Sequence, residues 1–180
     1  LGQASARDVL DAGAARIATD LADRPAVRAQ LLLAIGGAYR NLGLDAKAEP
    51  MLAEAAALFL SPAVDRPLDA SEALQQQSVI AGNSHRAAEA VALAERAEAL
   101  RVAGGDDSVE ARGDSLNHLG VAYTAAGDFD RARAVLAESL ALRRTRADAE
   151  PLDILVGLNN LARAERGAGR LDAAEALYAE

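Results

Sequence analysis

Ser115 stands three residues before His118, so on one helical turn a hydroxyl could meet an imidazole able to act as its base. Nucleophilic catalysis also needs a strained turn that exposes the hydroxyl and an oxyanion hole to receive the developing charge. A helix surface offers neither. We therefore expect Ser115 and His118 to be polar residues on a helix, and we predict no catalytic residue and no enzymatic activity for this chain.

The sequence also lacks the residue patterns that metal binding and phosphate binding require. His85 and His118 are the two histidines of the sequence, and Asp114 is the carboxylate nearest to His118. A metal site needs several such ligands on one face, so none is predicted. The glycine pairs at 36–37 and 104–105 do not follow a strand, as a phosphate-binding loop would require. No cofactor is therefore expected.

Asparagine side chains suggest a different chemistry, which is hydrogen bonding to a main chain. Asn117 lies in "SLNHLG", and Asn159 and Asn160 lie in the similar segment "GLNNLA". Each carboxamide carries donors and an acceptor, so a row of them can bond an extended peptide without demanding one sequence. This function requires structural elements that repeat and present the same face each time.

The composition predicts that these elements are helices. The 180 residues carry a net charge of −8, are 51% hydrophobic and only 3% aromatic, and are rich in alanine. The acidic balance argues against nucleic acid and anionic membrane partners. There is no cysteine, and no apolar run is long enough to span a bilayer. We expect an all-α protein.

A spaced pattern then recurs along the chain, centred on a glycine that is expected to end one helix before the next begins. In its clearest form the pattern is Gly120, Tyr123, Gly127, Ala132 and Leu136. The other copies are Gly36, Tyr39, Gly43, Ala48 and Leu52; Gln75, Ser78, Gly82, Ala87 and Val91; and Ala162, Glu165, Gly169, Ala174 and Tyr178. The hinge glycines at 43, 82, 127 and 169 are thus 39, 45 and 42 residues apart. Repeats of this length predict a solenoid of stacked helical hairpins.

Each residue of the pattern has an expected physical role. Gly120 lets the partner helix approach closely, Gly127 ends the first helix, Asp128 caps the second, and Phe129 seals the turn. The helices are predicted at 4–21, 25–41, 45–60, 66–82, 85–102, 108–126, 129–145, 151–168 and 171–180. Residues 1–24 are expected to be a capping helix or half of a preceding repeat. About four hairpins are expected to follow, at 25–62, 66–102, 108–146 and 151–180, the last of them truncated.

The spacing resembles the tetratricopeptide repeat, and "SLNHLG" and "GLNNLA" are similar to the longer repeats of the kinesin-light-chain type. The resemblance is weaker at Gln75, Ser78 and Glu165, which depart from the small or tyrosine residue of the family pattern. It implies a right-handed superhelical solenoid of antiparallel helix pairs whose first helices line a concave, peptide-binding face. The groove residues that it implies are Gln30, Arg40, Gln76, Asn117, His118, Thr124, Asn159, Asn160, Arg163 and Arg166.

Residues 5–44 also resemble the segment that leads into such arrays in large bacterial serine/threonine protein kinases, although no kinase motif is present. We expect a fragment of a larger bacterial signalling protein that binds a protein or extended peptide, cytoplasmic or extracytoplasmic according to its parent. One alternative is a regulatory domain that senses a small molecule or peptide and switches a transcriptional regulator. Another is self-association as a homodimer through the last hairpin, where Leu171, Ala174 and Tyr178 have no following unit.

Overall fold

The computed structural model describes residues 5–146 and 150–180, and within them the chain forms helices and no strand. The expected all-α class is confirmed. The helices are α1 (Ala6–Asp20), α2 (Pro25–Asn41), α3 (Asp45–Phe59), α4 (Pro67–Asn83), α5 (Ala87–Ala103), α6 (Val109–Ala125), α7 (Phe129–Thr145), α8 (Pro151–Gly167) and α9 (Leu171–Ala179). Each bound lies within two residues of its prediction, except that the predicted start of the first helix, residue 4, lies outside the described residues.

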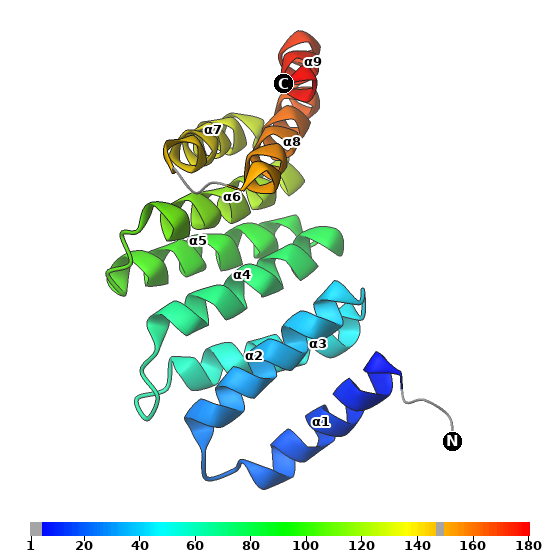
Figure 1. The fold of residues 1–180 in the computed structure, drawn as a ribbon, viewed down its shortest axis with the longest axis vertical. Coiled ribbons are helices and arrows are strands. Elements are labelled where there is room, and N and C mark those ends of the chain that lie inside the picture. The colour runs from blue at the N-terminus through cyan, green and yellow to red at the C-terminus, as the bar shows by residue number, and fades with distance from the viewer. Residues whose placement is uncertain (1–4, 147–149) are drawn as a thin grey trace.

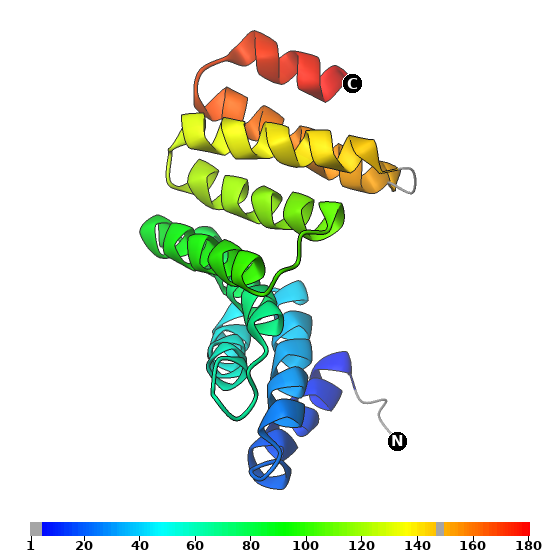
Figure 2. The same cartoon turned by 90° about the vertical axis from the view of Figure 1, so that its left-hand side faces the viewer.

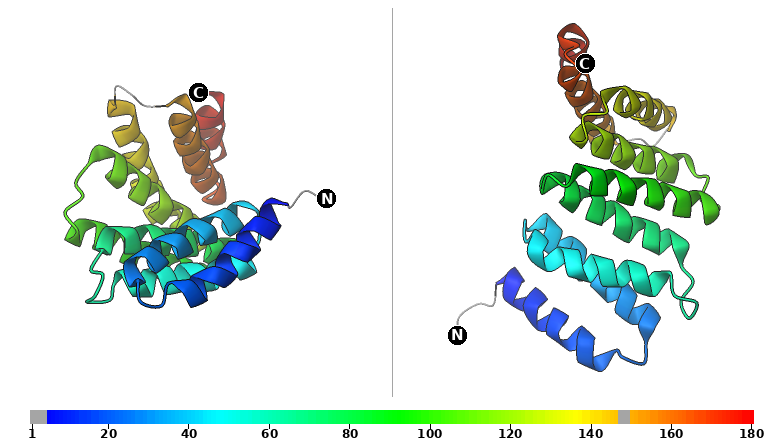
Figure 3. Two further views of the ribbon diagram at one scale, coloured as in Figure 1. Left: turned by 60° about the horizontal axis from the view of Figure 1, so that its bottom comes forward. Right: turned by 180° about the vertical axis from the view of Figure 1, so that it is seen from behind.

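The helices form successive antiparallel hairpins, α2–α3, α4–α5, α6–α7 and α8–α9, which stack in chain order (Figure 1). The second helix of each hairpin packs against the first helix of the next, so every interior helix has neighbours on both sides. Views from the side and from behind show an elongated, curving stack with the chain ends at opposite extremes (Figures 2 and 3). The expected solenoid of antiparallel helix pairs is confirmed.

The turn inside each hairpin repeats with a period of 42 residues. Gly43, His85, Gly127 and Gly169 all have positive φ, between 60° and 77°. At each turn the next N–H donates to the carbonyl five residues back, as in Leu44 to Tyr39 (2.9 Å) and its three equivalents. This is the Schellman arrangement that closes the carboxyl end of a helix.

The predicted hinge at Gly82 is therefore wrong. Gly82 lies inside α4, and the chain turns three residues later, at His85. The prediction relied on a glycine as the signal for a left-handed residue, but here a histidine adopts that conformation despite its steric cost. In the corrected frame the second hairpin contributes Ser78, Ala81, His85, Ala90 and Ala94, and all four repeats have the same length.

Small and large residues alternate where the two arms of a hairpin meet. A Cβ built on Gly36 would lie 2.9 Å from Leu52 Cγ, and one on Gly120 would lie 2.3 Å from Leu136 Cγ. The glycines thus allow the leucines of the second helix to pack directly on the first. Leucines in identical register complete the buried face of every first helix, at 32, 74, 116 and 158.

Polar contacts of matching geometry link neighbouring hairpins at two places. Tyr39 Oη donates to Asp11 on α1 (2.5 Å), and Tyr123 Oη donates to Glu95 on α5 (2.9 Å). A cation from the following second helix, Lys47 or Arg131, lies over each tyrosine ring, 5.4 Å and 4.5 Å from its centroid. The corresponding residues are each 84 positions apart, which is two repeats. The place of α1 before α2 is therefore that of α5 before α6.

Candidate peptide-binding groove

The first helices line the inner side of the stack. Among the described helices, α2 contacts α4, α4 contacts α6 and α6 contacts α8, whereas no second helix contacts the next second helix. The first helices are therefore closer together, and a stack curves toward the side on which its elements are closer. All ten residues predicted for the groove from the sequence lie on these first helices.

The 42-residue period arranges these residues in rows along the groove. One row holds Gln76, His118 and Asn160, and its neighbour holds Asn117 and Asn159. A third row holds Arg40, Thr124 and Arg166. Side chains that share a row project from equivalent positions of successive first helices, so an extended ligand lying across the helices would meet them in turn.

A hollow of about 510 Å³ lies between α2 and α4. Gln30, Arg40 and Gln76, all predicted groove residues, line it together with Gly37 and Glu72. Gln76 can lie over α2 only because residue 37 has no side chain: a Cβ there would be 2.9 Å from Gln76 Oε1. The absence of a side chain at one position of α2 thus shapes this hollow.

Two buried polar atoms in this hollow have no hydrogen-bond partner within the described part of the chain. They are Gln76 Oε1, an acceptor, and Arg40 Nε, a donor. The other ends of the same side chains are engaged, since Arg40 Nη2 donates to Asn41 Oδ1 (3.1 Å) and Gln76 Nε2 donates weakly to Glu72 (3.4 Å). An acceptor and a donor held in one hollow complement an amide group, which offers one of each.

The asparagines predicted to form a ladder divide into two groups. Asn160 Nδ2 donates to Asn117 Oδ1 (2.9 Å), which ties α8 to α6, and Asn117 is only 8% exposed. Asn159 is exposed beside this pair. Asn159 can therefore meet a ligand with its full bonding capacity, whereas the Asn117–Asn160 pair forms part of the groove floor.

The remaining predicted residues set the charge of the groove. Arg163 and Arg166 are exposed on α8, at the carboxyl end of the stack. Thr124 Oγ1 donates to the Gly120 carbonyl of its own helix (2.8 Å). Glu72 on α4 is exposed nearer the amino end. The groove thus carries an acidic group near α4 and a basic pair on α8.

Gln75 is a groove residue that the sequence-based frame missed. The misplaced hinge at Gly82 assigned Gln75 to the packing face, but the 42-residue period puts it in the row of Asn117 and Asn159. It lines a second hollow of about 160 Å³ between α4 and α6, together with Glu72 and Asp114. The equal spacing of the buried leucines at 32, 74, 116 and 158 is the sequence signal that would have placed it.

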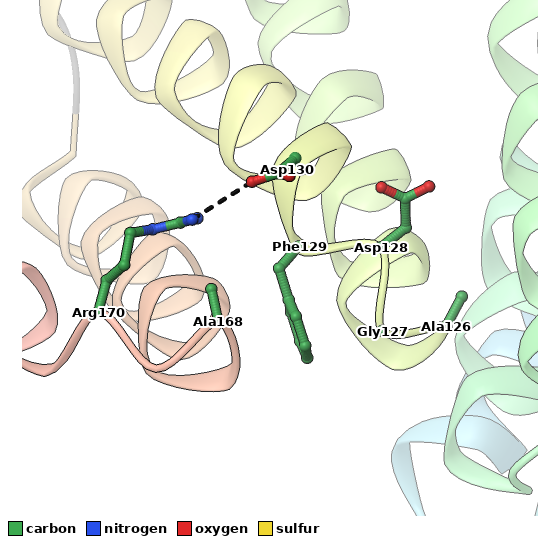
Figure 4. Close-up of a pocket in the computed structure, with 7 residues that line it drawn as sticks. All are labelled: Ala126, Gly127, Asp128, Phe129, Asp130, Ala168 and Arg170. Carbon is green, nitrogen blue, oxygen red and sulfur yellow. Dashed lines mark hydrogen bonds and ion pairs between the residues drawn. The ribbon is translucent and has the colours of Figure 1, made fainter.

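A third hollow lies at the hairpin tips, between the α6–α7 and α8–α9 turns (Figure 4). Phe129 points between the two turns and packs against Gly167, where a Cβ would be 2.3 Å from Phe129 Cε1. Asp128 Oδ1 accepts from the Arg131 N–H (3.2 Å), so the predicted cap is confirmed. Arg170 reaches Asp130 at 3.3 Å. These side chains close the turns and bond to one another.

His118 lies half-buried in the row that also holds Gln76 and Asn160. Burial, together with the positive charges of Arg40 and Arg143, lowers its pKa to about 4. The imidazole is therefore neutral at pH 7, with one nitrogen able to donate and the other to accept. His118 accordingly adds a neutral hydrogen-bonding group to the row that Gln76 and Asn160 continue.

This pKa predicts a pH dependence of stability. Between pH 6.5 and 4.5 the wild type is expected to lose about 1–2 kcal/mol of unfolding free energy relative to a His118→Asn variant. The unfolded histidine takes up a proton near pH 6.5 and the folded one only near pH 4. The unfolded state therefore binds more protons in this interval, and the free energy of unfolding decreases as the pH is lowered. Urea unfolding followed by circular dichroism at several pH values measures the difference. Parallel curves for the two proteins would contradict the assignment.

The described residues contain no group of three or more histidine and carboxylate side chains placed to hold a metal ion. None of the helices between residues 5 and 180 that the structure describes is long and apolar enough to cross a bilayer.

The fold and groove define a class of protein: an all-α solenoid of helical hairpins with a polar inner face. Residues 112–147 and 155–180 match the tetratricopeptide repeat family model. The hairpins are arranged like the longer, kinesin-light-chain-like tetratricopeptide repeats.

Solved structures of the same architecture resemble the whole chain. BtubC (BKLC) from P. vanneervenii superposes with a TM-score of 0.77 at 20% identity, over 95% of this chain and 69% of that one. The nearly identical TPR-like repeats of a protein assigned as a kinesin light chain from Podosopora anserina superpose with a TM-score of 0.70 at 21% identity, over 95% of this chain and 81% of that one. At these identities the likeness concerns the fold. A search of curated protein sequences finds no match.

Proposed function

We propose that the inner groove binds an extended segment of a partner protein through its main chain. The observation that carries this proposal is that Gln76 and Arg40, each with a buried side-chain atom that has no hydrogen-bond partner among the described residues, line a single open hollow. Because Gln76 Oε1 and Arg40 Nε are shielded from solvent, both side chains would turn toward the ligand to bond it. The N–H of one ligand amide would donate to Gln76 and a carbonyl would accept from Arg40. Each of these hydrogen bonds would satisfy a polar group whose burial without a partner is otherwise unfavourable.

The rows beyond this hollow extend the same recognition. Gln75, neutral His118 and Asn159 continue the supply of donors and acceptors across α4, α6 and α8. At the far end, Arg163 and Arg166 favour a ligand with acidic side chains there. We therefore expect a ligand that is selected loosely by its main chain and more strictly by the charge at one end.

Selection from a displayed library of random 12-residue peptides on the intact chain tests this proposal. The affinity of a selected peptide is expected to fall at least tenfold for an Arg40→Ala/Gln76→Ala variant, since a lost hydrogen-bonding pair is worth about 1.4 kcal/mol or more. Asn159→Ala is expected to have a smaller effect in the same direction. Replacing all three asparagines is less informative, because it also removes the Asn117–Asn160 bond.

Arg96→Ala provides the matched control. Arg96 is an exposed arginine on α5, a second helix outside the groove. Affinities that change equally for Arg96→Ala and for the groove variants would reject the groove. So would selected peptides whose binding none of the groove substitutions alters, provided that every variant keeps the helical circular dichroism of the wild type.

We further propose that this scaffold is the partner-binding arm of a larger bacterial signalling protein, with a serine/threonine kinase as its parent. The support is the resemblance of residues 5–44 to the segment that precedes such arrays in those kinases. Sequencing the neighbouring coding region tests the proposal. Kinase motifs upstream would support it, and a DNA-binding helix-turn-helix in the same reading frame would overturn it.

A further inference from the structure

The inner groove carries charges of opposite sign along its two edges. On one edge, Glu72 on α4 and Asp114 on α6 occupy the same position of the repeat, and we call this pair the acidic edge. On the other edge, Arg40 on α2 and Arg166 on α8 share a position, and Arg163 lies one turn before Arg166; these three form the basic edge. The two edges are ten positions apart in the repeat, which is about 15 Å along a helix. The rows of amide side chains lie between them.

The acidic edge is not neutralised by the chain itself. Glu72 has no ion pair among the described residues, and only a weak bond from Gln76 (3.4 Å) reaches it. Asp114 shares one guanidinium with Asp153, because Arg143 Nη2 donates to Asp114 (2.7 Å) while Nη1 lies 3.8 Å from Asp153 Oδ1. Burial, together with the negative charge of Asp153, raises the pKa of Asp114 although Arg143 opposes the shift. The acidic edge therefore retains negative charge that a further cation would balance.

The basic edge is likewise uncompensated. Arg40 Nη2 bonds to the neutral Asn41 (3.1 Å), and Arg163 and Arg166 are exposed. None of these three arginines has a carboxylate partner within residues 5–146 and 150–180. Each edge can therefore attract side chains of the opposite charge from a ligand.

The hollows of the groove give a ligand access to both edges. The hollow of about 510 Å³ is lined by Glu72 as well as by Arg40, so one ligand segment lying in it can meet both charges. The hollow of about 160 Å³ adds an apolar surface to the acidic edge, because Leu68 and Ala111 line it beside Glu72 and Asp114. Carboxylates next to apolar atoms suit lysine or arginine, whose methylene stems pack on apolar surface while the charged head stays with the carboxylates.

One arginine also lines the smaller hollow, but its charge is already balanced. Arg101 is only 6% exposed, and its Nε and Nη2 donate to the two oxygens of Glu98 (2.9 Å and 2.8 Å). Its Nη1 donates to the Asp106 carbonyl. Arg101 therefore does not offset the charge of the acidic edge.

We propose that the groove selects a segment of mixed charge, whose lysine or arginine side chains meet the acidic edge and whose aspartate or glutamate side chains meet the basic edge. This inference rests on the proposed function, in which the main chain of the ligand bonds to the amides of the groove floor. Successive side chains of an extended chain point to opposite sides, across the direction of its main-chain bonds. They would therefore point to the two edges in turn, so that basic and acidic residues of the ligand stand an odd number of positions apart.

Peptides selected from the 12-residue library on the intact chain are the probes for this inference. We expect them to combine basic and acidic residues at odd separations. Glu72→Lys is expected to weaken the binding of such a peptide by about tenfold or more, because an attraction becomes a repulsion. Replacing the basic residue of the peptide with glutamate is expected to restore binding to the Glu72→Lys variant but to weaken binding to the wild type. Fluorescence anisotropy of labelled peptides measures each affinity.

The matched control is Glu175→Lys, which makes the same change of net charge at an exposed carboxylate on α9, outside the groove. It is expected to alter the affinity by less than about twofold. Equal weakening by Glu72→Lys and Glu175→Lys would overturn the mixed-charge inference, as would selected peptides that carry charges of one sign only or that place opposite charges at even separations. The proposed function would still stand in these cases if Gln76→Ala, which alters no charge, weakens binding. Failure to select any peptide, or peptides indifferent to both Arg40 and Gln76, would overturn both.

Discussion

Replacing both arginines around Glu165 with methionine is expected to destabilise the carboxyl-terminal hairpins by about 3–5 kcal/mol. The Glu165 side chain is only 7% exposed, and its two oxygens are held by different arginines. Arg133 Nε lies 2.9 Å from Oε1, and Arg170 Nε donates to Oε2. Without these cations a buried carboxylate would have no counter-charge, which is among the costliest single defects in a folded protein.

Urea unfolding followed by circular dichroism, with hydrogen exchange of α8 as a local probe, measures this loss for the Arg133→Met/Arg170→Met variant. The pair that Arg170 makes with Asp130 is exposed and contributes little.

Adding Glu165→Leu to the double variant is the control. A leucine needs no cation, so the triple variant is expected to recover most of the lost stability, as buried ion pairs replaced by apolar residues commonly do. A double variant that loses less than about 1 kcal/mol, or a triple variant that recovers nothing, would show that the arginines act through packing rather than charge.

Glu165 also illustrates what the sequence could and could not predict. The spacing of the repeat placed Glu165 at the position that Tyr39 and Tyr123 occupy in the first and third repeats. Tyr39 and Tyr123 each meet a carboxylate 28 residues earlier, but the corresponding residue for Glu165 is Ala137. The fourth repeat instead provides its own carboxylate, and the two arginines that hold it come from α7 and from the turn before α9. Such contacts depend on how hairpins pack, which local spacing does not encode.

The helices themselves were predictable because their signals are local. Pro25, Pro67 and Pro151 each occupy the first position of a helix, and Asp128 caps another, as their residue types indicate. The turn at His85 was not, because histidine signals positive φ much more weakly than the nearby glycine at 82 does. It is fixed by the packing of α4 against α5 and by the Schellman bonds that follow from it.

The groove was predictable as a set of helix faces but not as a set of contacts. The 3.6-residue period placed Asn117, Asn159 and Asn160 on first helices, and their rows follow from the repeat. That Asn117 and Asn160 bond to each other, leaving Asn159 exposed, depends on the crossing of α6 and α8. The unpaired atoms of Arg40 and Gln76 likewise depend on the close approach that Gly37 allows.

Gly120→Val is expected to lower the free energy of unfolding by about 3 kcal/mol, although valine has a higher helix propensity than glycine. A Cβ at position 120 would be 2.3 Å from Leu136 Cγ and 2.6 Å from Leu136 Cδ2, so the two helices would have to separate or Leu136 would have to leave its rotamer. Thermal and urea unfolding measure the change.

The matched control is Gly82→Ala, whose Cβ would lie 3.8 Å from Ala125 Cβ, an ordinary contact. Because Gly82 is inside a helix with ordinary φ, this substitution is expected to stabilise the protein by about 0.5–1 kcal/mol.

The second repeat indicates how the defect at Gly120 can be repaired. There a larger residue, Ser78, stands in the glycine position and a smaller one, Ala94, in the leucine position, so the two sizes change in opposite directions. Adding Leu136→Ala to Gly120→Val reproduces this exchange. The loss of unfolding free energy in the double variant is expected to be smaller, by at least about 1 kcal/mol, than the sum of the losses in the two single variants. The reason is that the larger residue fills the cavity left by Leu136→Ala, and the smaller residue relieves the strain caused by Gly120→Val. Additive losses, or a Gly82→Ala variant that is destabilised, would mean that the 42-residue frame assigns the wrong residues to the contact between the arms of a hairpin. In that case the groove rows, which rest on the same frame, would be wrong as well.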